Sequence, residues 1–413
     1  MTRSHSALVI GLLIVLCLVS FWLGLGSLGI TDLDEGLYTA ASREMALTGD
    51  FITPRVNGEP FFEKPPLLYW LSAFAIRIFS TTESSARLPS AIAATLLVAL
   101  TFWFGSRRLS PVAALLGAAF LSLSPVMVAA GRLSTTDALL TLCVTLAIVA
   151  AEEATRAHRR RFTWFLVSAC ACGVGVLAKG APAIVLPAIT LGVWYFGFER
   201  RSLRPLLRIR SWAVILGMTF VIALIAFPWH MAALQANGRA FVDEYVVRQH
   251  LMRFQGGDVS HRAPFWFFVP GFLAGMFPWS LFTAAALCVR NRQSITQANQ
   301  NSEGPSSAIL PKLQQPVSTR TLLKTWFWVT FIIFSASGSK LISYILPLYP
   351  AAALLAGDYV AKLAKSPRAP RVMTTGGLAA LVILVGLWLA LVWPDPLLVL
   401  INRYSTKPVA LSP

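Results

Sequence analysis

The sequence predicts an all-α polytopic membrane protein, and three observations support this fold class. Of the 413 residues, 56% are hydrophobic and only 13% are charged, whereas a soluble domain carries roughly 25% charged residues. Apolar runs of about 20 residues, the length that crosses a bilayer as a helix, recur from end to end. Basic residues also gather in alternate loops between these runs.

The apolar runs define the expected transmembrane helices. The run at 65–80 is short, begins with Pro65-Pro66 and contains Arg77, so we expect a juxtamembrane or re-entrant helix there. Eleven other runs are predicted to span the membrane: 7–29, 86–106, 111–130, 134–151, 164–178, 182–198, 211–230, 264–288, 325–337, 341–358 and 375–393. The first is interpreted as an uncleaved span, because it is too long for a usual signal peptide and lacks a clear cleavage site.

The distribution of charge sets the orientation of these spans. With a cytoplasmic N-terminus and an outer C-terminus, the basic segments at 107–108, 156–161 and 198–210 all lie inside, as the positive-inside rule requires. The cytoplasmic side then receives 21 Lys and Arg against 5 Asp and Glu, and the outer side receives 14 against 13. The formal net charge of +17 is therefore a topology signal, and it gives no support for nucleic acid as a partner.

The predicted organisation is a single transmembrane domain over residues 1–393. Within it, 31–85 is the first outer loop with juxtamembrane helices, and 231–263 is the fourth outer loop. The cytoplasmic linker at 289–324 is rich in Ser, Gln and Asn, a composition typical of a disordered connector. Residues 394–413 are expected to form a short outer tail with no soluble C-terminal domain.

Carboxylates gather where the first span reaches the outer face, in ITDLDEGLYT. Asp34 and Glu35 precede a helical pattern that ends at Gly49-Asp50, and its apolar face comprises Leu37, Ala41, Met45 and Ala46. This pattern predicts an amphipathic helix on the membrane surface. Because the helix dipole stabilises an acid at the N-terminus, a capping role for Asp34 stays open beside a catalytic one.

Asp137 lies just inside an apolar span, in GRLSTTDALLTL. Ionisable residues in such places are costly and usually face a cavity or a partner, which favours a functional role. The competing interpretation is a capping box in which Ser134 is the N-cap and Asp137 the third helical residue.

Isolated cations converge on the same outer face. Several of them together indicate an anion site, such as a lipid phosphate. The residues are Lys64, Lys179, Arg253 and Lys340. Glu63 with His250 is compatible with a divalent metal site for Zn, Mg or Mn, although their separation is not a metal-motif spacing. No nucleotide-binding loop is visible, so no nucleotide cofactor is expected.

These segments together resemble a known family. DEGLYTAASREMALTGDFITPRVNGEPFFEKPPLLYW is similar to the first outer loop of the ArnT/PMT-type glycosyltransferases, which have the GT-C fold and include undecaprenyl-phosphate aminoarabinose transferases and protein O-mannosyltransferases. The resemblance continues in order through GRLSTTDALLT, LAKGAPA, the stretch at 227–254 and SGSKLISYILPLYP, and it covers most of residues 1–360.

The resemblance implies roles for individual residues. Asp34 matches the principal catalytic acid and Asp137 a second essential acid. Glu63 and Lys64 match a pair that lines the cavity, with the lysine near the carrier phosphate. Further matches are a metal site at Glu63 and His250 and phosphate contacts at Arg253 and Lys340. Glu35, Lys179 and Tyr344 are also expected to bind the substrate.

The resemblance also implies an activity. Family members take a sugar from a polyprenyl phosphate, such as undecaprenyl phosphate, and pass it with inversion to a lipid A-like lipid, glycan or protein acceptor outside the cytoplasm. We therefore expect a role such as lipopolysaccharide modification in a bacterial inner membrane, with the active site facing the periplasm. Many relatives carry two more spans and a soluble outer domain, and that part often shapes acceptor binding. The acceptor of this chain is therefore unspecified. A flippase of polyprenyl-linked sugars, a glycan polymerase or ligase, and a non-catalytic partner are the alternatives.

Overall fold

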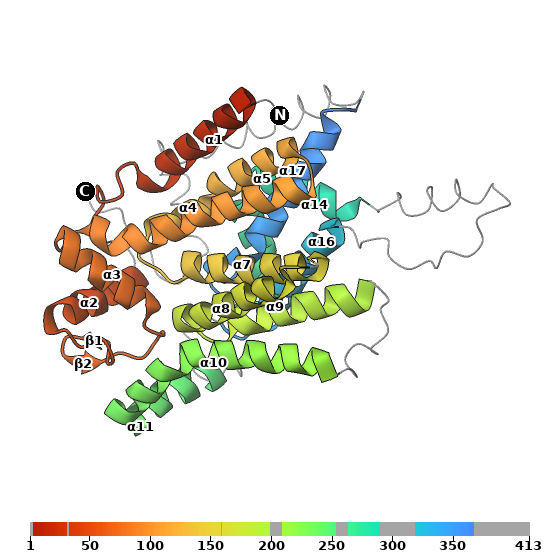
Figure 1. Cartoon of the computed structure of the whole chain (residues 1–413). Coiled ribbons are helices and arrows are strands. Elements are labelled where there is room, and N and C mark those ends of the chain that lie inside the picture. Colours follow the sequence, from red (N-terminus) through yellow and green to blue (C-terminus); the bar gives the residue numbers. More distant parts are fainter. Residues whose placement is uncertain are drawn as a thin grey trace. The chain divides into compact units, whose positions relative to one another are not determined.

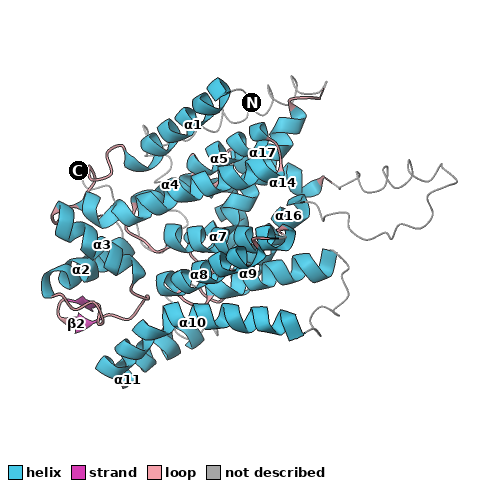
Figure 2. Ribbon diagram, viewed as in Figure 1, coloured by secondary structure: helices cyan, strands magenta, loops and turns pink. Residues whose placement is uncertain are grey.

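The computed structural model describes residues 3–30, 33–157, 159–198, 209–252, 263–289 and 319–366. These residues are helical almost throughout (Figure 2). Residues 1–360 form one compact unit and 361–413 a second.

The N-terminal part of the first unit combines an apolar helix with a folded segment that precedes α4 (Figure 1). Its elements are α1 (Arg3–Cys17), η1 (Leu18–Trp22), α2 (Leu33–Thr48), β1 (Arg55–Val56), β2 (Glu59–Pro60) and α3 (Leu67–Phe79). The two strands form an antiparallel hairpin. At its tip, Asn57 and Gly58 have φ values of 55° and 82°, and positive φ at both positions is what a two-residue type I′ turn requires.

Helix α2 confirms the predicted amphipathic pattern. Ala41, Met45 and Ala46 are buried on one side of it, and Leu37 is partly buried. Gly49, with φ of 76°, donates its N–H to the carbonyl of Met45 and ends the helix, as a glycine in the left-handed region commonly does.

The middle of the unit is a layer of helices packed on one another. They are α4 (Glu83–Arg108), α5 (Pro111–Ser122), α6 (Pro125–Arg132), α7 (Asp137–Arg156), α8 (Arg161–Lys179), α9 (Pro182–Gly192) and η2 (Val193–Phe198). The axes of α5 and α6 differ by 62°, so the span predicted at 111–130 is bent if both helices belong to it. Pro125 cannot donate a backbone hydrogen bond and instead starts a new helix.

The C-terminal part of the described chain adds the remaining helices. They are α10 (Ile209–Asn237), α11 (Arg239–Phe241), η4 (Val242–Met252), η5 (Phe265–Phe267), α13 (Phe268–Gly275), α14 (Trp279–Cys288), α16 (Thr319–Ala336), η6 (Ile342–Leu348) and α17 (Tyr349–Leu363). The span predicted at 264–288 is divided between α13 and α14. The span predicted at 375–393 lies outside the described residues.

The chain is a polytopic membrane protein. Among the described residues, five helices are long and apolar enough to cross a membrane, or six if α5 and α6 form one bent span. They lie at Glu83–Arg108, Asp137–Arg156, Arg161–Lys179, Trp212–Asn237 and Ile342–Leu363. Other apolar helices, including α3, are shorter, so the total of eleven spans stays a prediction.

Helices α4 and α7 run in the same direction and define two ends of the unit. Near their N-terminal ends, the Ser90 hydroxyl donates to the carbonyl of Thr135 over 3.2 Å. Near their C-terminal ends, Arg108 contacts Glu152 and Glu153 at 2.8 Å. Asp137 and the Arg108 cluster therefore lie at opposite ends of spanning helices, as the predicted topology requires.

Close packing joins the two halves of the unit. Helix α5 meets α17 where Gly117 faces Gly357, and a Cβ atom added to Gly357 would lie 2.6 Å from the Gly117 nitrogen. Small residues at this crossing let the two backbones approach, as they do in membrane helix pairs. The crossing fixes α17 and, just before it, η6, which carries Tyr344.

Candidate active site

One polar pocket brings together side chains from five segments of the unit. These segments are α2, the stretch before α3, the residues around the start of α7, the end of α8, and η6 with the residue before it. The lining residues are Asp34, Tyr38, Glu63, Lys64, Thr135, Thr136, Asp137, Lys179, Leu341, Ser343 and Tyr344. Six of the predicted site residues are among them: Asp34, Glu63, Lys64, Asp137, Lys179 and Tyr344.

The pocket is small and largely filled by its own charged groups. Its volume is about 30 Å³, which is room for a few water molecules.

Asp137 and Lys179 form an ion pair on one wall of this pocket. Asp137 is the first residue of α7 and Lys179 is the last residue of α8, so each charge also has the sign that its helix dipole favours. The N-cap of α7 is Thr136, with no side-chain cap hydrogen bond. The capping-box interpretation of Ser134 and Asp137 is therefore wrong, and the Asp137 carboxylate faces a cation instead.

Glu63 and Lys64 form a second ion pair among the lining residues. The Lys64 ammonium lies 2.6 Å from Glu63 Oε1, and the Tyr38 hydroxyl donates to the same oxygen over 3.4 Å. Burial, followed by the charge of Glu63, raises the pKa of Tyr38 well above its usual value. Tyr38 thus stays a neutral hydrogen-bond donor beside this carboxylate at physiological pH.

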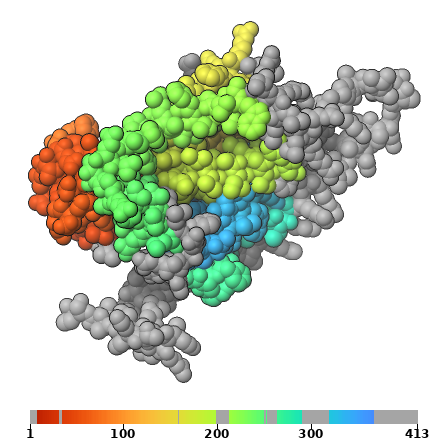
Figure 3. All heavy atoms as spheres, turned by 90° about the horizontal axis from the view of Figure 1, so that it is seen from below, coloured from red at the N-terminus to blue at the C-terminus, as the bar shows by residue number. Residues whose placement is uncertain are grey.

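An aromatic cluster holds the segment that carries Glu63 and Lys64. Phe62 is buried and meets Phe241 edge to face, with ring centroids 5.2 Å apart, and Trp229 and Tyr245 complete the cluster. The indole of Trp229 donates to the carbonyl of Ile52 over 3.0 Å. Figure 3 shows the first outer segment, in orange, lying against the green segment that contains α10 and α11.

Other predicted site residues lie elsewhere. Glu35 is fully buried in an ion pair with Arg87 and does not line the pocket, so its predicted substrate contact has no structural support. Lys340 is buried, donates to the carbonyl of Ser337 over 2.5 Å, and is also outside the pocket lining. Arg253 lies outside the described residues, and of His250 only the backbone, within η4, is described.

The described residues do not assemble a metal site. Nowhere in the described part of the chain do three His, Cys, Asp or Glu side chains come together in a way that would hold a metal ion. Glu63, one of the two predicted ligands, directs an oxygen to Lys64.

Known proteins are similar to the part of the chain that carries this pocket. The family described as dolichyl-phosphate-mannose-protein mannosyltransferase matches residues 63–230, a range that contains Glu63, Lys64, Asp137 and Lys179. An undecaprenyl phosphate-alpha-4-amino-4-deoxy-L-arabinose arabinosyl transferase of Pectobacterium carotovorum is 29% identical over 86% of this chain and 60% of its own length. The corresponding protein of Aeromonas salmonicida is 32% identical over 79% of this chain and 55% of its own.

Solved structures agree with these sequence matches. ArnT from Cupriavidus metallidurans bound to undecaprenyl phosphate superposes with a TM-score of 0.74 and 25% identity, over 95% of this chain and 66% of that one. The chain is similar in sequence and in fold to ArnT/PMT-type proteins. The oligosaccharyltransferase AglB from Archaeoglobus fulgidus, with a TM-score of 0.56 and 13% identity, supports the shared GT-C fold alone. This chain spans about 60% of the length of the curated relatives.

Some residues of this pocket escaped the sequence analysis. Tyr38, Thr135 and Thr136 line the pocket, and Arg87 is buried behind it. Arg87 carried a usable signal, because an arginine at the edge of an apolar run needs a partner. The hydroxyl-bearing residues carried none, because such side chains are common near helix ends.

Proposed function

We propose that this chain is a membrane glycosyltransferase that moves a sugar from a polyprenyl phosphate carrier, undecaprenyl phosphate in bacteria, to an acceptor on the non-cytoplasmic face. The acceptor classes that the family offers are a lipid A-like lipid, a glycan and a protein. The observation that carries the proposal is the pocket itself, in which Asp34 and Asp137 lie with the cations Lys64 and Lys179. The named relatives and the ArnT likeness support it.

The residues of the pocket suit a single displacement at the anomeric carbon. The acceptor oxygen forms a bond to that carbon while Asp34, as general base, takes the acceptor proton. The bond between the carbon and the phosphate oxygen breaks, and its electron pair leaves with the polyprenyl phosphate. The phosphate thereby gains negative charge, which the ammonium groups of Lys64 and Lys179 stabilise. One such step inverts the anomeric centre.

The small volume of the pocket suggests how the donor phosphate is bound. Lys64 now contacts Glu63, and Lys179 contacts Asp137. A phosphate that enters offers each lysine a second anion, so the lysines exchange or share their carboxylate partners as the pocket opens. In this proposal Asp137 acts through Lys179, by orienting it toward the phosphate.

The same proposal places the protein in a bacterial inner membrane with the pocket facing the periplasm. The Arg108 cluster lies at the far ends of α4 and α7 from Asp137. Basic residues favour the cytoplasmic side, so the carboxylate pocket belongs to the opposite side.

Turnover of a radiolabelled polyprenyl-phosphate sugar tests the proposal. We expect the wild type to release free polyprenyl phosphate and Asp34→Asn to do so about 100-fold more slowly, a loss of about 2.7 kcal/mol of transition-state stabilisation. Asp243→Asn, which removes an exposed carboxylate of η4 outside the pocket lining, is the matched control and should keep wild-type activity. Equal rates for Asp34→Asn and wild type would make Asp34 a helix cap and favour the transport hypothesis.

A further inference from the structure

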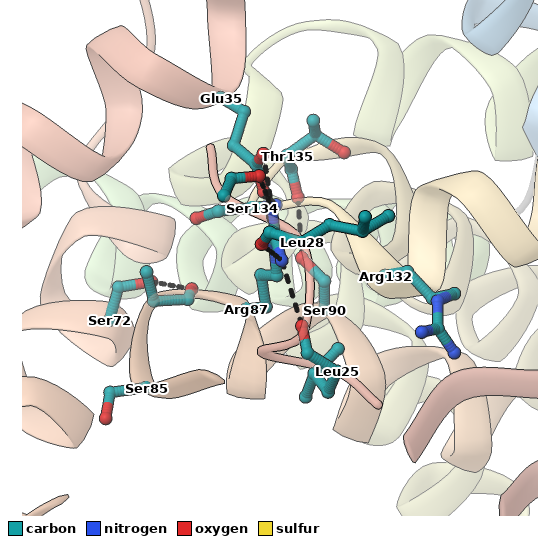
Figure 4. Close-up of polar contacts among 12 residues, drawn as sticks. Leu25, Leu28, Glu35, Ser72, Ser85, Arg87, Ser90, Arg132, Ser134 and Thr135 are labelled. Atoms are coloured by element: carbon teal, nitrogen blue, oxygen red, sulfur yellow. Dashed lines mark hydrogen bonds and ion pairs between the residues drawn. The ribbon is translucent and has the colours of Figure 1, made fainter. Parts of the chain in front are cut away.

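A buried arginine behind the pocket makes an unusually complete set of hydrogen bonds. Arg87, on α4, donates from Nε and Nη2 to the two carboxylate oxygens of Glu35 over 2.7 and 2.9 Å. Its remaining donors reach backbone carbonyls of Leu25, Leu28 and Gly29 at 2.7 to 2.9 Å. The Arg87 and Glu35 side chains are only 3% and 0% exposed, so solvent contributes almost nothing to holding them. Figure 4 shows Arg87 pointing toward Glu35 and Leu25.

The same ion pair extends to the loop that precedes α7. Glu35 Oε1 accepts a further hydrogen bond from the backbone N–H of Ser134 over 2.9 Å. One turn after Arg87, the Ser90 hydroxyl donates to the carbonyl of Thr135. Helix α4 therefore holds this loop at two adjacent points, both drawn in Figure 4.

The two held segments are those that carry the pocket carboxylates. Glu35 directly follows Asp34, and Ser134 precedes Asp137 by three residues. Asp34 and Asp137 themselves line the pocket, whereas Glu35 and Arg87 do not. A shift of either segment would change the distance between the two carboxylates.

We propose that Arg87 and Glu35 form a positioning pair that fixes Asp34 and Asp137 relative to each other. The effect on turnover rests on the proposed function, because misplacing a reacting group by about 1 Å can cost about 100-fold in rate. The geometric part of the proposal, that Glu35 holds the loop at Ser134, stands without any assumption about the reaction.

Energetics distinguish a positioning role from simple stabilisation. A buried ion pair often adds no net stability, because the desolvation of both charges offsets their attraction. The bidentate arginine instead fixes the orientation of its partners, because its planar guanidinium donates hydrogen bonds in one fixed geometry. The Arg87–Glu35 pair joins three separate segments, namely 25–29, the start of α2 and the loop before α7.

Glu35→Gln tests the pair against a matched control. The glutamine amide keeps the volume of the carboxylate but removes its charge. It also replaces one acceptor oxygen with an NH2 group, which cannot accept the hydrogen bond that Arg87 donates. Glu152→Gln is the control, because Glu152 is equally buried, pairs with Arg108 and Arg156, and lies at the far end of α7. We expect both variants to lower the melting temperature. Only Glu35→Gln should lower kcat per folded protein, by about tenfold or more, with the KM for the donor within about threefold of wild type.

Two results would overturn the proposal. One is a kcat for Glu35→Gln that equals that of Glu152→Gln per folded protein, since the pair would then be structural only. The other is a matching rise in the donor KM, which would mean that Glu35 contacts substrate. Glu35→Asp, which keeps the charge but shortens the side chain, should recover part of the lost kcat.

Hydrogen exchange separates this proposal from the proposed function. In a peptide that covers residues 130–140, the Ser134 amide should exchange faster in Glu35→Gln than in wild type, and Glu152→Gln should leave it unchanged. If the wild type turns over no polyprenyl-phosphate sugar, the proposed function fails, and this exchange measurement still decides whether Glu35 holds the loop. Unchanged exchange in Glu35→Gln would refute the positioning pair whatever the activity.

Discussion

Lys179, the last residue of α8, donates a hydrogen bond to Asp137, the first residue of α7. The two helices pack side by side in opposite directions, so the N-terminal end of one meets the C-terminal end of the other. The ammonium of Lys179 also lies 4.8 Å from the ring centroid of Tyr344, which brings η6 to the same point. This ion pair therefore joins three elements of the pocket.

The Asp137–Lys179 pair predicts strongly non-additive mutations. Asp137→Asn and Lys179→Met should each lower turnover by about 100-fold, and the double variant should be no worse than the poorer single one, because each removal already disables the pair. Each single variant should also cost about 3 kcal/mol of stability, since it leaves one charge buried without its partner. Single-turnover rates and thermal melts of purified protein measure both effects. Losses that simply multiply in the double variant would show that the two residues act separately.

Lys64 is expected to act mainly in donor binding. Lys64→Met should raise the KM for the polyprenyl-phosphate sugar by about tenfold, because the pocket would lose one of its two lining lysines. Arg55→Gln is the control, since Arg55 lies in the same outer loop, makes a half-exposed ion pair with Asp50, and is outside the pocket lining. Donor titrations for the two variants provide the comparison. Equal KM values would remove Lys64 from the phosphate site.

The sequence predicted most of the pocket because local motifs and topology constrain it together. Successive spans cross the membrane in alternating directions, so the residues at every second span end lie on the same face. The predicted residues at such ends are Asp34, Lys64, Asp137 and Lys179. The structure then adds that Asp137 pairs with Lys179, a contact between helix ends that no sequence spacing reveals.

Two predicted site residues, Glu35 and Lys340, lie outside the pocket lining for equally local reasons. Lys340 lies in a tight connection, where its ammonium donates a hydrogen bond to the carbonyl of Ser337 and does not line the pocket. Glu35 and Asp34 are adjacent in sequence, but on a helix neighbouring side chains point in different directions. One of them consequently faces the pocket and the other faces Arg87.

The predicted topology can be tested by labelling single cysteines from either side of the membrane. Glu59→Cys and Arg160→Cys, each made in a chain without its five native cysteines, replace exposed residues at the first outer loop and at the connection between α7 and α8. A membrane-impermeant maleimide applied to intact spheroplasts should label the first variant and not the second, with both labelled after lysis. Labelling of both, or of Arg160→Cys alone, in intact cells would contradict the orientation.

The aromatic cluster around Phe62 is expected to hold the Glu63–Lys64 segment in place. Phe62→Ala should lower stability by about 3 kcal/mol, because it leaves a cavity beside Phe241 and Tyr245. It should also raise the donor KM, since the neighbouring lysine loses its fixed position. Phe74→Ala is the control for loss of a phenyl group, because Phe74 on α3 is 64% exposed. Thermal melts and donor titrations are the measurements, and a normal KM in a destabilised Phe62→Ala protein would limit the cluster to a folding role.

The proposed metal site at Glu63 and His250 makes a prediction that depends on Lys64. The Lys64 ammonium forms an ion pair with Glu63 Oε1, so a divalent metal that binds this carboxylate must compete with the ammonium. Metal content of purified protein after incubation with zinc, magnesium or manganese should therefore fall in Glu63→Gln and His250→Ala and rise in Lys64→Met. His230→Ala is the matched control, because the ring nitrogens of His230 already contact the Ala226 carbonyl and the Tyr245 hydroxyl at 2.7 and 3.1 Å. A metal content that is the same in all four variants, or absent from the wild type, would reduce Glu63 to the partner that orients Lys64 before the donor phosphate arrives.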